Sequence, residues 1–252
     1  MLINPLKDKL SALKLTGMLE ALEEQIRMPE LVRDLSFEDR MGLVVDREIA
    51  LQESLRTGRR LKAAKLRMSA SIENIDFRVS RGLKKPLILS LADGAWIENH
   101  QNILITGPTG IGKSYVAEAL GQKACRQGHR VLLLHVPRLF LALALARGTG
   151  RLLTFFRNLA RLDVLLLEDF GLSSCTSEQR QDLLEILDDR HQTRSTILTS
   201  QLPVGAWHKQ IGEPTVADAI MDRLLHGAYV IEMKGESLRK RRTDEPAPDG
   251  TK

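Results

Sequence analysis

Cysteines, long apolar runs and aromatic residues are all scarce in this sequence of 252 residues, and each shortage excludes a class of protein. Only Cys125 and Cys175 are present, without the spacing of a disulfide framework or a zinc site, so we expect reduced thiols in a cytoplasmic protein. No apolar run reaches the roughly 18 residues that a membrane span needs, so we expect no membrane partner. Aromatic residues make up 4% of the chain, which argues against a binding surface built on stacked rings.

Histidine is present, but its distribution indicates no metal centre. None of the histidines has metal-ligand spacing or a neighbouring nucleophile. We therefore expect structural or surface roles for His100, His129, His135, His191, His208 and His226.

The stretch from Gly107 to Ser114 fits the phosphate-loop pattern G-x-x-x-x-G-K-[ST]. An apolar run of strand length precedes it and a helical pattern follows, which an ordinary glycine-rich turn does not require. A loop between a strand and a helix start surrounds an anion with backbone N–H groups. We expect bound ATP, with Lys113 at the β- and γ-phosphates and the Ser114 hydroxyl on Mg²⁺. The expected nucleotide contacts are Gly107, Pro108, Thr109, Gly110, Ile111, Gly112, Lys113, Ser114 and Tyr115.

Short apolar segments alternate with helical patterns in the second half of the chain. This alternation predicts an α/β fold, with a parallel sheet covered by helices on both faces. Ligands of such sheets bind at the carboxyl ends of the strands, where the glycine loop also lies. The expected strands are 102–106, 130–136, 163–169, 195–199 and 228–233, and the expected helices are 115–127, 138–146, 177–191 and 215–225.

Two acids, Glu168 and Asp169, end one of these strands. We expect Glu168 to hold Mg²⁺ together with Ser114, through water, and Asp169 to orient the attacking water. Their order is the reverse of the usual Asp-Glu, so slow hydrolysis is predicted, and the alternative is a pair of acids that merely ends a strand. After the next strand, Ser200 or Gln201 is placed to hydrogen-bond the γ-phosphate.

Hydrolysis also needs positive charge on the transferring phosphoryl group. Arg223 and Arg239 are the two candidates, and residue chemistry alone does not choose between them.

The N-terminal part of the chain reads as helical, with one helix over the leucine pattern from Leu6 to Ile26 and a second that opens at Ser36. Residues 56–85, at its end, carry 10 basic and 2 acidic side chains. Such a cluster favours a polyanion such as nucleic acid, and a solvated helix face is the alternative. The expected DNA contacts in this cluster are Arg56, Arg59, Arg60, Lys62 and Lys65.

Several motifs together resemble one family. The sequence is similar to the IstB family, AAA+ ATPases encoded beside the transposase of bacterial insertion sequences and related to the helicase loader DnaC. The motifs are 103–110 (ILITGPTG), 166–172 (LLEDFGL), 199–204 (TSQLPV) with Trp207, 217–224 (ADAIMDRL) and 235–240 (GESLRK).

The resemblance implies a helical N-terminal domain over residues 1–72 and an AAA+ core over 73–242. Residues 243–252 are polar and contain two prolines, so we expect a disordered tail there. It places Ser200 or Gln201 at sensor I, Arg223 at an arginine finger that acts on the adjacent subunit, and Arg239 at sensor II. A further helix, at 138–147, falls where this clade lines a DNA channel, so Arg138, Arg147 and Arg151 are added to the expected DNA contacts. Because the chain ends soon after Arg239, any helical lid is short or missing.

The resemblance also implies a function. Family members assemble as oligomers on double-stranded DNA when ATP is bound, deform the DNA, and recruit or stimulate the transposase, in the bacterial cytoplasm and on the nucleoid. The alternatives are a DnaC-like loader of a replicative helicase and, from another class, a small-molecule kinase. A kinase would need neither the basic segment nor Arg223.

Overall fold

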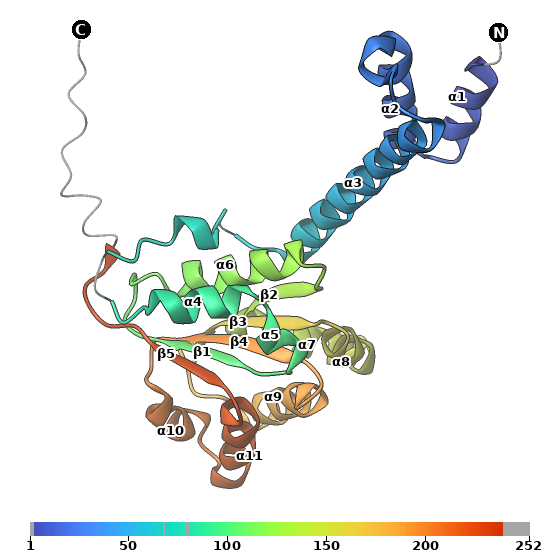
Figure 1. The fold of residues 1–252 in the computed structure, drawn as a ribbon. Helices are drawn as coiled ribbons and strands as arrows, with labels where there is room; N and C mark the ends of the chain where they lie inside the picture. Colours follow the sequence, from blue (N-terminus) through green and yellow to red (C-terminus); the bar gives the residue numbers. More distant parts are fainter. Residues whose placement is uncertain (1–2, 68, 79–80, 239–252) are drawn as a thin grey trace, which may run out of the picture. The chain divides into compact units, whose positions relative to one another are not determined.

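The computed structural model describes residues 3–67, 69–78 and 81–238 (Figure 1). The chain forms two compact units, one up to Arg59 and one from Arg60 onward. The division falls earlier than the boundary expected after residue 72, because Ala64, Ala70 and Ile72 are buried in the core of the second unit. Residues 239–252, which include Arg239 and the expected tail, lie outside the described part.

The N-terminal unit is helical, as predicted. The single helix expected between Leu6 and Ile26 is two helices, because the chain takes a left-handed turn at Lys14, where φ is 58°. The Ser36 hydroxyl accepts the Asp39 N–H at 3.1 Å, which confirms the predicted helix start. The elements are α1 (Ile3–Ala12), α2 (Thr16–Arg27), η1 (Pro29–Val32) and α3 (Phe37–Ala64), and the last of these runs past the unit boundary.

The second unit is built on a five-stranded sheet in which every pairing is parallel, as the alternating pattern predicted. The strand order is β2-β3-β4-β1-β5, so β3, β4 and β1 each lie between two neighbouring strands. The strands are β1 (Ile103–Thr106), β2 (Val131–His135), β3 (Val164–Phe170), β4 (Ser195–Ser200) and β5 (Tyr229–Glu232).

Helices cover both faces of this sheet in two layers. Successive side chains of a strand point to opposite faces, so neighbouring residues of one strand pack against different helix layers. Ile103 and Ile105 pack on the side of α6, whereas Leu104 packs on the side of α9 and α11; Figure 1 shows α4 and α6 on one side and α9 to α11 on the other. The first layer contains η2 (Ile72–Asn74), α4 (Lys85–Ala92), α5 (Ala95–Glu98) and α6 (Lys113–Arg126). The second contains α7 (Val136–Gly148), α8 (Leu152–Ala160), α9 (Ser177–Arg190), η3 (Val204–Ala206), α10 (Trp207–Ile211) and α11 (Pro214–Leu225).

Four α-helices in the described part of the chain were not expected from the sequence, namely α4, α5, α8 and α10. Helix α11 begins at Pro214, one residue before the expected start, and Glu213 caps it. The Glu213 carboxylate accepts the N–H groups of Thr215 and Val216 at 3.1 and 2.7 Å. No helix in the described part of the chain combines the length and apolar character that crossing a membrane requires.

Candidate active site

The glycine loop leaves the carboxyl end of β1 and leads directly into α6. Its glycines adopt backbone angles that other residues avoid, with φ of 144° at Gly107, 81° at Gly110 and 100° at Gly112. A Cβ atom on Gly107 would overlap the backbone carbonyl of Met233, and one on Gly110 would overlap the side chain of Ser237. The loop therefore depends on glycine both for its backbone path and for its close packing.

Lys113 is the first residue of α6 and is almost fully buried. Its Nζ donates a hydrogen bond to the Pro108 carbonyl oxygen at 2.9 Å, within the loop. Burial lowers the pKa of Lys113, while the nearby carboxylates of Asp169 and Glu168 act in the opposite direction. The structure thus brings the lysine and both predicted acids to the same end of the sheet.

A bulge in β3 sets the directions of the two acids. Successive residues of a regular strand point to opposite faces, but the register of β3 on β4 shifts between Leu167 and Phe170. Asp169 has a φ of 60°, and its backbone N–H donates to the Thr199 hydroxyl at 3.3 Å. A bulge changes the direction in which a side chain points. The carboxylates of Glu168 and Asp169 can therefore both lie near Lys113, although the two residues are consecutive in the strand.

Glu168 offers a carboxylate that suits a divalent cation. The residue is buried, and its Oε2 forms an ion pair with Arg67. Its Oε1 is also buried and has no hydrogen-bond partner within the described residues. An orphaned buried carboxylate oxygen, with the Ser114 hydroxyl in the first turn of α6, matches the hard oxygen ligands that Mg²⁺ prefers.

His135 is a site residue that the sequence reasoning missed. Its Nε2 lies 2.7 Å from Oδ2 of Asp169, and its Nδ1 is buried without a hydrogen-bond partner in the described residues. The residue ends β2 and pairs in register with Glu168 on β3. Its position at the end of a strand was the only available signal, since the neighbour relation of β2 and β3 is not visible in the sequence.

Ser200 is the last residue of β4 and Gln201 follows it, but the two side chains lie in different environments. Ser200 is fully buried, and its hydroxyl donates to the Phe170 carbonyl oxygen at 2.8 Å. Gln201 is exposed, and its Oε1 accepts the Thr109 hydroxyl of the glycine loop at 2.7 Å. Of these two sensor I candidates, only Gln201 has a side-chain contact with the loop among the described hydrogen bonds.

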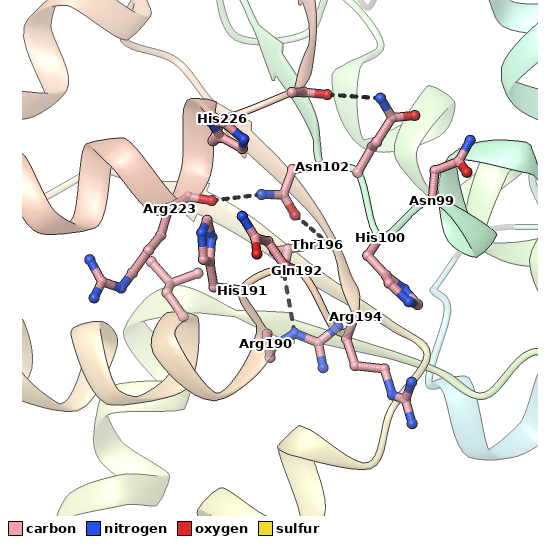
Figure 2. Close-up of a pocket in the computed structure, with 13 residues that line it drawn as sticks. Asn99, His100, Asn102, Arg190, His191, Gln192, Arg194, Thr196, Arg223 and His226 are labelled. Carbon is pink, nitrogen blue, oxygen red and sulfur yellow. Dashed lines mark hydrogen bonds between the residues drawn. The ribbon is translucent and has the colours of Figure 1, made fainter.

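Arg223 lies at the opposite end of β1 from the glycine loop. The side-chain amide of Asn102, directly before β1, donates to the backbone carbonyl of Arg223 at 2.9 Å (Figure 2). The four residues of β1, roughly 13 Å of extended chain, separate this point from the loop. Arg223 also borders a pocket of about 240 Å³ with His191, His226 and Arg194. The residue is therefore far from the phosphate loop of its own chain.

The chain just before Arg239 packs on the glycine loop. Leu238 donates its backbone N–H to the Gly110 carbonyl oxygen at 3.0 Å. Arg239 itself, the sensor II candidate, lies outside the described residues.

The predicted DNA contacts are mostly exposed, but Arg147 and Arg60 differ from the rest. Arg147 is engaged by its own chain, because its guanidinium forms ion pairs with Glu178 at 2.7 Å and Asp182 at 2.5 Å. Arg60 is half-buried. Exposed cations are Arg56, Arg59, Lys62, Lys65, Arg138 and Arg151.

Comparisons with known proteins agree with this arrangement. The model of a family described as IstB-like ATP binding protein matches residues 8–246. The chain is 49% identical over 240 residues to a putative insertion sequence ATP-binding protein, y4pL, of Sinorhizobium fredii, covering 95% of this chain and 98% of that protein. It is 31% identical to a putative ATP-binding protein in an insertion sequence of Mycobacterium tuberculosis, with 94% of each covered.

Solved structures show the same fold at low sequence identity. The crystal structure of DnaI has a TM-score of 0.58 at 21% identity, covering 66% of this chain and 92% of that one. The crystal structure of the DnaC helicase loader has a TM-score of 0.56 at 16% identity, covering 68% of this chain and 100% of that one. The sheet and its helices therefore have the AAA+ fold.

Proposed function

Because the chain belongs to the family of IstB-like ATP-binding proteins, and is thereby an AAA+ ATPase, we propose that it is the ATP-dependent DNA-binding helper of an insertion sequence. In this proposal it assembles as an oligomer on double-stranded DNA, deforms the duplex, and recruits or stimulates the transposase of the element. Its place is the bacterial cytoplasm, on the nucleoid when it is bound to DNA.

The observation that carries the proposal is the separation of Arg223 from the glycine loop along β1. Arg223 lies at the opposite end of β1 from the phosphate loop of its own copy, too far away to act on a nucleotide bound there. A second copy that presents Arg223 to the first would complete the site. Assembly and hydrolysis are linked in this way, and this is the reason to expect an oligomer.

Each residue of the site then has a role in hydrolysis. The loop N–H groups and Lys113 bind the phosphates, and Asp169, held by His135, orients a water for attack on the γ-phosphorus. Mg²⁺ held by Ser114 and Glu168 would neutralise charge on the phosphate oxygens. Gln201, which contacts Thr109 of the loop, would hydrogen-bond the γ-phosphate, and Arg223 of the neighbouring copy would stabilise the charge that develops on the transferring group.

Slow hydrolysis follows from the order of the two acids. Asp169 is shorter than the usual glutamate by one methylene and shares its carboxylate with His135. Its reach toward the attacking water is reduced accordingly. A slow ATPase suits a protein whose ATP-bound assembly on DNA must last long enough to meet a transposase.

Cations and exposed leucines support a DNA-binding surface. Leu141 and Leu145 on α7 are 72% and 70% exposed, on the same helix as Arg138. Apolar side chains beside cations are used by DNA-bending proteins, which insert them between base steps. We assign α7 to contact with the duplex, together with the basic cluster that begins at Arg56.

The decisive experiment is assembly on a DNA duplex with ATP, with a non-hydrolysable analogue, and without nucleotide. We expect assembly with either nucleotide only, and a fall in affinity with salt at a log–log slope of about −5 if six phosphates are neutralised. Equal assembly without nucleotide would contradict the proposal that ATP controls assembly on DNA. Retention of the transposase by the immobilised protein would support the proposed partner, whereas retention of a replicative helicase would favour a loader.

Mixing two inactive variants tests the shared site directly. Lys113→Ala lacks phosphate binding but keeps Arg223, and Arg223→Ala has the opposite defect. In an equal mixture, about a quarter of the interfaces pair an intact loop with an intact arginine. Activity should return in the mixture, and a mixture as inactive as its components would show that the site is not shared.

A further inference from the structure

Arg67 forms an ion pair with the acid that we assign to Mg²⁺. Its guanidinium Nη2 contacts Oε2 of Glu168, across 101 positions of sequence. The two partners differ in freedom, because the Arg67 side chain is 50% exposed and the Glu168 side chain only 3%. The arginine is therefore the partner that can leave, and the carboxylate is the partner that stays.

The backbone at Arg67 is fixed independently of this ion pair. Its N–H donates to Oε2 of Glu118 at 2.6 Å, and Glu118 is buried on α6, the helix that begins with the glycine loop. On the chain immediately before and after, Ala64 and Ala70 are fully buried in the core. The guanidinium can thus swing away from Glu168 while the chain beneath it remains in place.

A guanidinium and a divalent cation on the two oxygens of one carboxylate oppose each other's binding. Each carries positive charge, and their repulsion is weakly screened beside a buried group. The guanidinium occupies Oε2, and Oε1 is the orphan that suits the metal. Binding of the metal would weaken the hold of Glu168 on Arg67, and the ion pair would in turn oppose binding of the metal.

We propose that Arg67 competes with Mg²⁺ for Glu168, so that the ion pair is a brake that loading of the metal with ATP releases. The inference rests on the proposed metal role of Glu168 and goes beyond it by naming a residue that controls loading. Arg67 lies within the basic cluster of residues 56–85, three residues after the end of α3 at Ala64. Release of its side chain would therefore occur next to the segment that we assign to DNA.

Binding of a fluorescent ATP analogue, measured against Mg²⁺ concentration in the full chain, tests this brake without relying on turnover. In Arg67→Gln we expect the half-saturating Mg²⁺ concentration to fall about three- to tenfold, the range for an ion pair with one buried partner. Arg67→Lys keeps the charge but loses the planar guanidinium, so its value should lie between those of the wild type and the glutamine variant.

Arg130→Gln is the matched control, because Arg130 makes the same kind of ion pair with Asp163, before the starts of β2 and β3, and its Mg²⁺ dependence should equal that of the wild type. Thermal unfolding midpoints would confirm that each variant is folded. An unchanged or higher half-saturating concentration in Arg67→Gln would overturn the competition while leaving the metal site intact. A wild-type Mg²⁺ dependence in Glu168→Gln would instead remove the metal role of Glu168, and with it the brake, whereas the shared site through Arg223 is tested separately by mixing the two inactive variants.

Discussion

Asp188 on α9 holds Arg223 on α11 through a single carboxylate oxygen, with Oδ1 2.7 Å from Nε and 2.6 Å from Nη2. A third contact, from Nη1 to the Ala219 carbonyl oxygen at 3.0 Å, completes the fixation of the guanidinium. An arginine on a helix surface has many rotamers, and these three contacts select one of them. The orientation of the proposed arginine finger is thus set by a neighbouring helix of the same chain.

Replacement of Asp188 should slow hydrolysis without weakening ATP binding. In Asp188→Asn the charge that orders Arg223 is lost, and we expect turnover to fall about tenfold, against roughly 10³-fold for Arg223→Ala. Steady-state kinetics and nucleotide affinity measure the two effects separately. Asp189→Asn, an exposed neighbour on the same helix, serves as the control and should behave as the wild type.

His135 should act as a positioning residue for Asp169. His135→Ala removes the partner at 2.7 Å, so we expect kcat to fall about tenfold or more while the ATP affinity stays unchanged. His135→Asn, which keeps a hydrogen-bond donor, should recover part of the loss. The control is His208→Ala, since His208 forms a comparable pair with Asp218 at 3.1 Å on the surface. A parallel loss of ATP binding in His135→Ala would indicate a structural role instead.

The glycine loop allows a paired test of conformation. Gly110→Ala places a Cβ atom where φ is 81° and where the Ser237 side chain already lies, so we expect at least about tenfold weaker ATP binding. Gly148→Ala, at the end of α7, meets no atom within 4 Å and should stabilise the protein by about 0.5 kcal/mol. Calorimetric titration with ATP and thermal unfolding compare the two. Normal ATP binding by Gly110→Ala would contradict the role of the loop.

Cys125 predicts a pH dependence of stability. Burial raises the pKa of its thiol from 9.0 to about 11, against a smaller opposing effect of Arg60. Between these values the folded chain holds a proton that the unfolded chain releases, so the stability it contributes is complete below about pH 9 and is lost as the pH rises toward 11. The free energy of unfolding should therefore fall more steeply with pH in the wild type than in Cys125→Ala, by on the order of 1 kcal/mol per pH unit. If the free energy of unfolding fell equally with pH in the two proteins, the raised pKa of Cys125 would be refuted.

The sequence was sufficient for the parts of the site that are local in the chain. The spacing from Gly107 to Ser114 specifies the loop, and the apolar strand before Glu168 and Asp169 places both acids at the carboxyl end of the sheet. The alternation of strands and helices likewise predicted a parallel sheet with two covered faces. These features depend on neighbours within a few residues, which a sequence displays directly.

The features that escaped prediction depend on contacts between distant segments. His135 and Asp169 are 34 positions apart, and Arg67 and Glu168 are 101 apart, so the strand order and the path of the chain after α3 bring them together. The break at Lys14 was missed because a non-glycine residue takes a positive φ there. Helices α4 and α5 are short, which leaves too few turns for a periodic pattern to be recognised.

Because the loop and Arg223 lie at the two ends of β1, each copy has two different contact surfaces, one that receives an arginine and one that supplies it. An open row of n copies would then contain n − 1 complete catalytic sites. The copy at one end would bind ATP, but no neighbour would supply an arginine to its site. Turnover per copy would climb with the length of the row, steeply for the first few members and then toward a plateau, while a closed ring would reach that plateau at once. Counting phosphate released per copy against the length of the supporting duplex would therefore tell a filament from a ring without an image of either.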